Sequence, residues 1–174
     1  TFQNIEDMKL LKKRNGLSMS KGRFIPGGSG VELSKYHPGT RHSTKSKALR
    51  RSLGIAESDF VVMFVGRLQL DKGLIEFVEA ARKINKERQD IAFVMVGAPD
   101  IGNIRSLSES QLALWESEED VIFTGRREDV PDLMAMADTI TTPTFYREGL
   151  PRTLLEAAAS GLPLIGTDVP GVRE

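Results

Sequence analysis

The stretch Phe60-Val-Val-Met-Phe-Val-Gly-Arg-Leu-Gln-Leu-Asp-Lys-Gly73 decides which fold the sequence predicts. It begins with a continuous apolar run, which is expected of a β-strand that is covered on both faces. The following segment, 73–86, carries an apolar stripe at helical spacing, made of Leu74, Phe77, Val78, Ala81 and Ile84. A buried strand that leads directly into an amphipathic helix is the repeating unit of an α/β domain.

The same alternation continues to the end of the chain. The sequence predicts strands at 91–96, 121–124, 139–142 and 163–167, and helices at 106–116, 130–137 and 151–160. Strands that alternate with helices imply right-handed crossovers and a parallel sheet. We therefore expect a Rossmann-like three-layer α/β/α domain with a parallel sheet.

The N-terminal part of the chain is organised differently. Charged and apolar residues recur at helical spacing at 5–13, and a turn-rich segment follows at 25–30. The polar segment 35–46 is typical of a linker, and 47–53 of a short basic helix. The chain starts at Thr1 rather than at methionine and stops at Glu174, where another helix is expected, so we expect a piece of a longer protein.

Composition limits the classes of function. The 174 residues suffice for one domain with a sizeable core. The 24 basic and 24 acidic residues cancel, so charge gives no indication of a nucleic-acid partner, and we expect none. The absence of cysteine excludes a disulfide framework and fits a reducing compartment. No apolar run approaches the roughly 18 residues that a membrane-spanning helix needs, so we expect no transmembrane segment.

The ends of the predicted strands are candidate binding loops, because ligands of open α/β sheets bind at the carboxyl ends of the strands. Three of these ends open with glycine, in the pairs Gly66-Arg67, Gly97-Ala98 and Gly125-Arg126. Glycine there lets a ligand approach the backbone closely, although it can equally satisfy a turn. Near the first of these ends, Arg67 and Lys72 would neutralise a diphosphate without any metal.

The stretch Phe145-Tyr-Arg-Glu-Gly-Leu-Pro-Arg-Thr-Leu-Leu-Glu-Ala-Ala-Ala-Ser-Gly161 places two carboxylates around a predicted helix start. Pro151 suits the first helical turn, because its missing N–H would be unpaired there in any case. The open helix N-terminus offers backbone N–H groups and a partial positive charge, which suit a phosphate. Glu148 precedes the helix and Glu156 lies about two turns inside it, roughly 10 Å along at the usual rise. This separation fits a sugar hydroxyl on one side of a diphosphate and a ribose on the other.

These residues resemble the donor-site signature of the glycosyl transferases group 1 family, which contains retaining, nucleotide-sugar-dependent enzymes with the GT-B fold. The family pattern of Glu, seven residues and Glu is present at 148–156. Segment 64–73 is similar to the family's Gly-Arg-Leu…Lys-Gly segment, and 161–174 continues the likeness downstream. Segment 25–32, Ile25-Pro-Gly-Gly-Ser-Gly-Val-Glu32, resembles the connection from the family's first domain into its second. The resemblance implies that 1–40 ends the acceptor-side domain and its linker, and that 41–174 is the nucleotide-sugar-binding domain, truncated at its C-terminus.

The resemblance also implies a role for each candidate site residue. It assigns Glu148 as the catalytic residue, which contacts the hydroxyls of the transferred sugar and helps positive charge develop at the anomeric carbon. It assigns Glu156 to the ribose hydroxyls and the main chain of Arg126 to the nucleobase. The implied contacts of the donor diphosphate are Arg67, Lys72 and the backbone N–H groups of Gly149 and Leu150.

Structural explanations compete with some of these roles. Arg67 and Lys72 would otherwise be two solvated charges, and Glu156 a surface residue of a helix that glutamate favours. Glu148 would gain about 0.3–1 kcal/mol from the helix dipole alone. A cation at the position of Lys72 opposes the dipole of the following helix unless an anion is bound. The resemblance to the family is the main reason to favour the functional interpretation of Arg67 and Lys72.

Other chemistries lack their motifs. No Gly-x-Gly-x-x-Gly follows a strand, and no Gly-x4-Gly-Lys-Ser/Thr loop is present. His37 and His42 lie in the polar linker without a partner at ligand spacing, and no Asp-x-Asp pair ends a strand. We therefore expect no metal and no cofactor, with the nucleoside-diphosphate sugar as substrate.

The leading hypothesis is the donor-binding part of a glycosyltransferase that acts with retention, most similar to bacterial enzymes of cell-surface polysaccharide synthesis. The resemblance implies a sugar or lipid-linked sugar acceptor, bound by the missing first domain, and a cytoplasmic enzyme that is peripheral at the inner face of the membrane. Two alternatives stay open. One is a non-enzymatic α/β module that binds a nucleotide or a partner protein, and the other is a GT-B-fold nucleotide-sugar epimerase.

Overall fold

The computed structural model describes residues 1–15, 22–25, 29–41 and 43–173. His42, Glu174 and the centre of the 25–32 segment lie outside the described residues.

A parallel sheet forms the centre of the domain. Its five strands lie in the order β3-β2-β1-β4-β5, and every adjacent pair is parallel. In β1 and β2 the register runs from Phe60 opposite Ile91 to Val65 opposite Val96. This strand order is that of a Rossmann-like sheet, so the predicted fold class is confirmed. The strands are β1 (Phe60–Val65), β2 (Ile91–Val96), β3 (Ile122–Phe123), β4 (Thr139–Thr142) and β5 (Leu164–Gly166).

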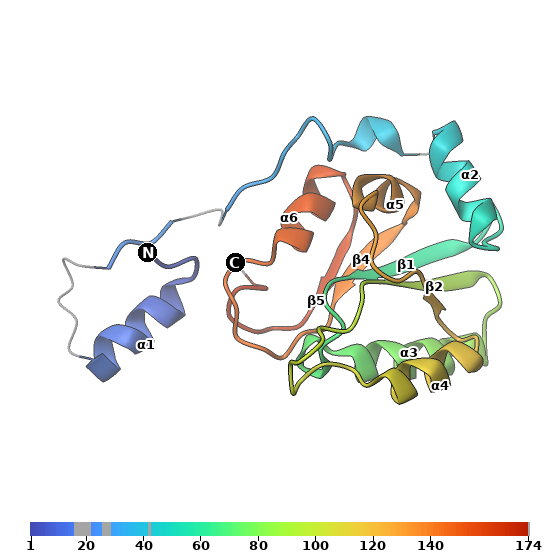
Figure 1. Ribbon diagram of the computed structural model, residues 1–174. Coiled ribbons are helices and arrows are strands. Elements are labelled where there is room, and N and C mark those ends of the chain that lie inside the picture. Colours follow the sequence, from blue (N-terminus) through green and yellow to red (C-terminus); the bar gives the residue numbers. More distant parts are fainter. Residues whose placement is uncertain (16–21, 26–28, 42, 174) are drawn as a thin grey trace.

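Helices cover both faces of the sheet. Figure 1 shows α3 and α4 on one face, and α2, α5 and α6 on the other, which gives the expected three layers. The helices of these layers are α2 (Thr44–Ser52), α3 (Leu74–Asn85), α4 (Glu109–Ser117), α5 (Val130–Met136) and α6 (Arg152–Ala159). Two short 3₁₀ helices, η2 (Pro38–Thr40) and η3 (Leu70–Lys72), lie in the connections.

Each face of the sheet has its own apolar core, because successive side chains of a strand point to opposite faces. On one face, Val61 and Met63 of β1 pack in a cluster with Leu133, Met134 and Met136 of α5. On the other face, Phe64 packs with the α3 stripe and with Trp115 of α4. The apolar run of β1 is therefore buried on both sides, as its sequence predicts.

Several predicted helix boundaries shift by a few residues because side chains cap the first turn. Ser43 accepts a hydrogen bond from the Ser46 N–H at 3.1 Å, so α2 begins at Thr44, inside the segment predicted as linker. Ser108 accepts from the Gln111 N–H at 3.2 Å and starts α4 later than predicted. Pro151 is the N-cap of α6 rather than its first helical residue, which corrects the prediction.

The N-terminal segment forms one helix, α1 (Ile5–Asn15), as the spacing of its residues predicts. The Asn4 side-chain carbonyl accepts a hydrogen bond from the Asp7 N–H at 2.7 Å, which caps the helix. Figure 1 shows α1 outside the three layers, on the side of the domain where the C-terminus lies.

Candidate functional site

The site lies where the parallel strands end at their carboxyl termini. The loop after β1 carries Arg67 and Lys72, and the loop after β4 carries Glu148 and Gly149. The Thr153 hydroxyl donates to the Val65 carbonyl at 3.3 Å, so the first turn of α6 lies beside the end of β1. The fold therefore brings these two loops and one helix start to the same edge of the sheet.

The loops after β1 and β4 touch at Gly73. This residue ends η3 with φ +79°, a left-handed conformation that favours glycine. A Cβ at this position would come within 2.2 Å of the Pro143 carbonyl oxygen. Close backbone contact here places Lys72, the preceding residue, next to the loop of Glu148.

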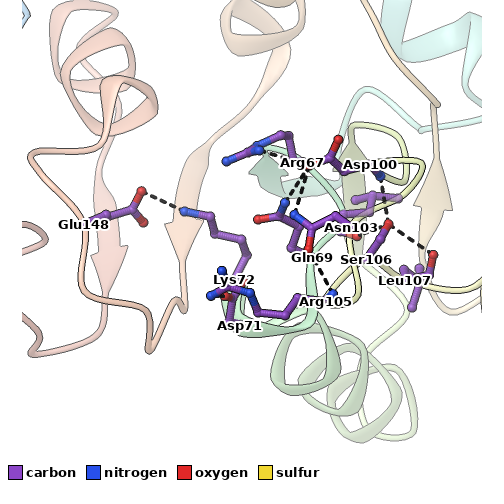
Figure 2. A network of polar contacts seen from close by, with 11 residues as sticks. Arg67, Gln69, Asp71, Lys72, Asp100, Asn103, Arg105, Ser106, Leu107 and Glu148 are labelled. Atoms are coloured by element: carbon purple, nitrogen blue, oxygen red, sulfur yellow. Dashed lines mark hydrogen bonds and ion pairs between the residues drawn. The ribbon is translucent and has the colours of Figure 1, made fainter.

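Lys72 and Glu148 form an ion pair. The Lys72 Nζ lies 2.7 Å from the Glu148 Oε2, and the two side chains are 15% and 22% exposed. Figure 2 shows the two side chains reaching toward each other from their separate loops. The structure thus brings two predicted site residues into direct contact, in a pairing that the sequence does not reveal.

A second set of contacts fixes the loop that precedes Glu148. The Asp71 carbonyl accepts from the Thr144 hydroxyl at 3.0 Å and from the Phe145 N–H at 3.2 Å. The Asp71 carboxylate also accepts from Arg105 at 2.8 Å. The Tyr146 ring lies 5.0 Å from the Arg105 guanidinium carbon and 5.5 Å from the Lys72 Nζ, within the range of cation–π attraction. Sequence reasoning missed Arg105 and Tyr146, because their interaction depends on tertiary contact alone.

Arg67 has a different environment from Lys72. Its side chain is 66% exposed, and it donates to the Asp100 carboxylate at 3.0 Å. Figure 2 shows this contact on the side of the loop that follows β2. A hydrogen bond from Asn103 lowers the pKa of Asp100, and the charge of Arg67 adds to this effect. Arg67 is thus a largely solvated cation held at the sheet edge by a carboxylate, so its structural and functional interpretations both stay open.

Glu156 lies on α6 with a largely buried side chain that is 12% exposed. Burial raises the pKa of Glu156, while the charge of Arg152 and a hydrogen bond from Tyr36 act in the opposite direction. Burial and the nearby Glu156 carboxylate raise the pKa of Tyr36. The simple surface-residue explanation for Glu156 does not fit this burial. Sequence reasoning missed the contact between Glu156 and Tyr36, which precedes η2.

The remaining predicted site residues are those to which the resemblance assigns contacts through the backbone. Gly149 and Leu150 directly follow Glu148, before the Pro151 cap of α6. Arg126 is exposed and follows Gly125, whose carbonyl accepts from the Gly97 N–H at 3.0 Å and so ties the ends of β2 and β3 together. The roles of Gly149, Leu150 and Arg126 stay predictions.

The arrangement offers cations and backbone donors to an anion, and carboxylates to hydroxyl groups. Lys72 and Arg67 provide positive charge at the ends of the central strands, and the start of α6 adds a helix N-terminus. Glu148 and Glu156 provide hydrogen-bond acceptors. Among the described residues, no group of three His, Asp or Glu side chains has a metal-binding arrangement. Nor does any described helix have the length and apolar character needed to cross a membrane.

The fold and the site define a Rossmann-like α/β domain with cationic side chains at the carboxyl ends of its strands. The sequence model of the family described as glycosyl transferases group 1 matches residues 45–174, so the chain belongs to this family. The resemblance noted in the sequence is therefore confirmed. The predicted division at residues 40 and 41, and the role of each site residue, stay predictions.

Relatives of this chain act in bacterial glycan and glycolipid synthesis. The UDP-Gal:alpha-D-GlcNAc-diphosphoundecaprenol alpha-1,3-galactosyltransferase of Escherichia coli is 30% identical over 168 residues, 95% of this chain and 41% of that protein. The alpha-galactosylglucosyldiacylglycerol synthase of Streptococcus pneumoniae is 29% identical over 157 residues, 88% of this chain and 40% of that protein. The present chain thus spans well under half the length of these curated relatives.

A solved structure has the same fold. The crystal structure of Anabaena HepE in complex with UDP and glucose superposes with a TM-score of 0.78 at 23% sequence identity. The match covers 99% of this chain and 45% of that one. At this level of identity the likeness establishes the fold.

Proposed function

We propose that this chain binds a nucleoside-diphosphate sugar, as the donor-binding part of a retaining glycosyltransferase. The observation that carries the proposal is the contact between Lys72 and Glu148, 2.7 Å apart at the carboxyl edge of the sheet. This contact supports the proposal because a cation that would bind the diphosphate lies beside a carboxylate that would bind the sugar, in a chain that belongs to the glycosyl transferases group 1 family.

In this proposal the donor lies along the edge of the sheet. Lys72, Arg67 and the N–H groups of Gly149 and Leu150 bind the diphosphate, and they stabilise the negative charge that it gains on leaving. Glu148 accepts hydrogen bonds from the sugar hydroxyls and stabilises positive charge at the anomeric carbon. Glu156 binds the ribose hydroxyls, and the main chain of Arg126 contacts the nucleobase. Neither a metal ion nor a cofactor is required, because the protein itself supplies the neutralising charges.

The relatives suggest the chemical class of donor and acceptor. A UDP-hexose is the first donor to test, because the name of the Escherichia coli relative includes UDP-Gal and the HepE complex contains UDP. We propose an acceptor hydroxyl on a sugar, carried by a lipid, in cell-surface polysaccharide synthesis. The complete enzyme would then work on the cytoplasmic side, peripheral to the inner face of the membrane.

Isothermal titration calorimetry on the 174-residue chain tests the proposal. We expect UDP and UDP-galactose to bind, and Lys72→Ala to weaken both by about 1.5–3 kcal/mol, the range for hydrogen bonds to charged groups. Lys83→Ala is the matched control, because it removes an exposed lysine from the last turn of α3. Failure of UDP, ADP and GDP, each with and without a hexose, to bind the folded chain would contradict the proposal.

A further inference from the structure

A buried asparagine of the N-terminal segment contacts the backbone of the loop that carries Glu148. Asn4 is 1% exposed, although it precedes α1 and lies far from the loop in sequence. Its Nδ2 donates to the Glu148 carbonyl at 3.1 Å and to the Asp7 Oδ2 at 2.8 Å. Its Oδ1 accepts from the Asp7 N–H, so both ends of the side chain are held.

Further contacts dock the N-terminal segment on the same loop. Arg147 donates to the Asp7 carboxylate at 3.0 Å. The Gln3 side chain lies against Gly149, where an added Cβ would come within 2.0 Å of the Gln3 Oε1. The ion pairs of Arg147 with Glu6 and Asp7 are about half exposed and contribute little. Asn4 therefore provides the specific, buried contact.

The hydrogen bond from Asn4 fixes the orientation of one peptide group. The Glu148 carbonyl and the Gly149 N–H belong to the same peptide bond, which is planar and trans, so they point in opposite directions. When Asn4 holds the carbonyl, the N–H is turned to the opposite side. Hydrogen bonding at the carbonyl also polarises the peptide and strengthens the N–H as a donor.

The C-terminal part of the chain encloses the same peptide. Gly171 has φ +91°, and a Cβ there would come within 2.3 Å of the Glu148 carbonyl oxygen and 2.4 Å of the Gly149 carbonyl oxygen. The backbone at Glu148 is therefore confined between Asn4 and Gly171. Two segments far apart in sequence hold a single peptide in one orientation.

We propose that Asn4 is a positioning residue of the donor site, which directs the Gly149 N–H toward the donor diphosphate by holding the Glu148 carbonyl. This inference rests on the proposed function. It adds that the site is completed by a segment that precedes the sheet domain. Asn4 acts through the backbone of Glu148 and Gly149 and does not itself contact the reacting atoms.

Two variants separate this role from the capping of α1. Asn4→Asp has the same shape and keeps an acceptor for the Asp7 N–H, but it cannot donate to the Glu148 carbonyl. Asn4→Ser keeps a capping oxygen on a side chain too short to reach that carbonyl. Ser43→Ala is the matched control, because it removes the N-cap of α2 and leaves the donor loop untouched.

The experiment combines UDP titration with ¹⁵N NMR of the Gly149 amide in the 174-residue chain. Both Asn4 variants are expected to weaken UDP binding about five- to tenfold, and to shift the Gly149 amide resonance before UDP is added. Ser43→Ala is expected to lower stability and to change neither readout. Folding is followed by the fluorescence of Trp115, which is buried in the core of the sheet domain.

Each outcome decides the inference. Wild-type UDP affinity in both Asn4 variants would overturn the positioning role and leave the proposed function intact. Weaker binding with an unchanged Gly149 amide would overturn it too, because the loss would then arise elsewhere. Absence of UDP binding by the wild-type chain would overturn the proposed function and this role together.

Discussion

Replacing Glu148 by glutamine is expected to tighten the binding of UDP and to leave the binding of a UDP-sugar nearly unchanged. In the structure the carboxylate of Glu148 is the partner of Lys72 at 2.7 Å. A diphosphate that binds Lys72 must take the place of this carboxylate. Glu148→Gln removes the competing negative charge and keeps the shape of the side chain. UDP should therefore bind the variant more tightly. A UDP-sugar makes the same gain at its diphosphate but should lose hydrogen bonds that its hydroxyls make to Glu148.

The magnitude follows from the burial of the ion pair. Exposed pairs contribute about 0.2–1 kcal/mol, and hydrogen bonds to charged groups about 1.5–3 kcal/mol. With side chains that are 15% and 22% exposed, this pair lies between the two classes. A gain of about 1–1.4 kcal/mol for UDP is up to about tenfold in Kd. Because the amide is a weaker acceptor than the carboxylate, a loss of similar size is expected for the sugar. Because both ligands carry the diphosphate, the gain applies to both and the loss only to the UDP-sugar, so the ratio of the UDP and UDP-galactose dissociation constants should change by up to about tenfold.

Calorimetry with UDP and UDP-galactose on the wild type, Glu148→Gln and Lys72→Met measures both effects. Lys72→Met should weaken both ligands, and Lys83→Ala should weaken neither. Circular dichroism checks that every variant is folded. If Glu148→Gln weakens UDP as much as Lys72→Met does, then Glu148 orients Lys72 for the phosphate instead of competing with it. The reasoning on competition would in that case be wrong.

Four further outcomes are expected. Arg67→Ala should weaken UDP binding by about 0.5–1.5 kcal/mol, less than Lys72→Ala in calorimetry, because solvent screens a side chain that is 66% exposed. Gly73→Ala should lower the free energy of urea unfolding by about 2 kcal/mol or more, because it adds a backbone clash to left-handed strain. Gly54→Ala is the control, because Gly54 has φ +72° but open space around it, and this variant should cost only the strain of about 1 kcal/mol. Burial raises the pKa of Glu156 above the ordinary 4.5, so the folded state binds its proton more tightly than the unfolded state. The free energy of unfolding should therefore fall as pH rises through the range just above 4.5. Urea unfolding should show a smaller fall for Glu156→Gln. UDP titrations should be unchanged by EDTA, since Lys72 and Arg67 supply the neutralising charge, and a loss of binding restored by magnesium would contradict this.

The fold could be predicted from the sequence because its signals are local. The run at Phe60–Val65 is apolar at every position. Such a run is typical of a strand that is covered on both faces. The stripe of α3 follows it directly, so the βα unit is legible without any long-range information. The boundaries were less accurate, since Ser43 and Ser108 satisfy the first turns of their helices with side-chain oxygens. A capping side chain determines where a helix begins, whereas residue pattern and polarity determined the predicted starts of these two helices.

The candidate site could be predicted only in part. Strand ends and the Glu148–Glu156 spacing indicate where a ligand binds, because parallel strands all end at one edge. No local pattern indicates that Lys72 pairs with Glu148, or that Arg105 lies by the ring of Tyr146, since these contacts join separate loops. Asn4 had one local signal, the Asn-x-x-Asp spacing of a helix cap. That signal predicts the start of α1 and says nothing about the Glu148 carbonyl.

The anchoring of the Glu148 loop determines how the site can respond to a donor. Asn4 and Gly171 enclose the Glu148 peptide, and the Asp71 carbonyl holds the loop upstream at Phe145. A backbone held at both ends has little freedom to move when a ligand arrives. The Lys72 and Glu148 side chains, in contrast, can exchange their mutual contact for contacts to a diphosphate and a sugar by rotamer changes alone. Binding should therefore re-pair the side chains of Lys72 and Glu148 on a nearly fixed backbone. A crystal structure with UDP-galactose in which the Glu148 backbone has shifted by more than about 2 Å, the scale of a loop rearrangement, would contradict this view.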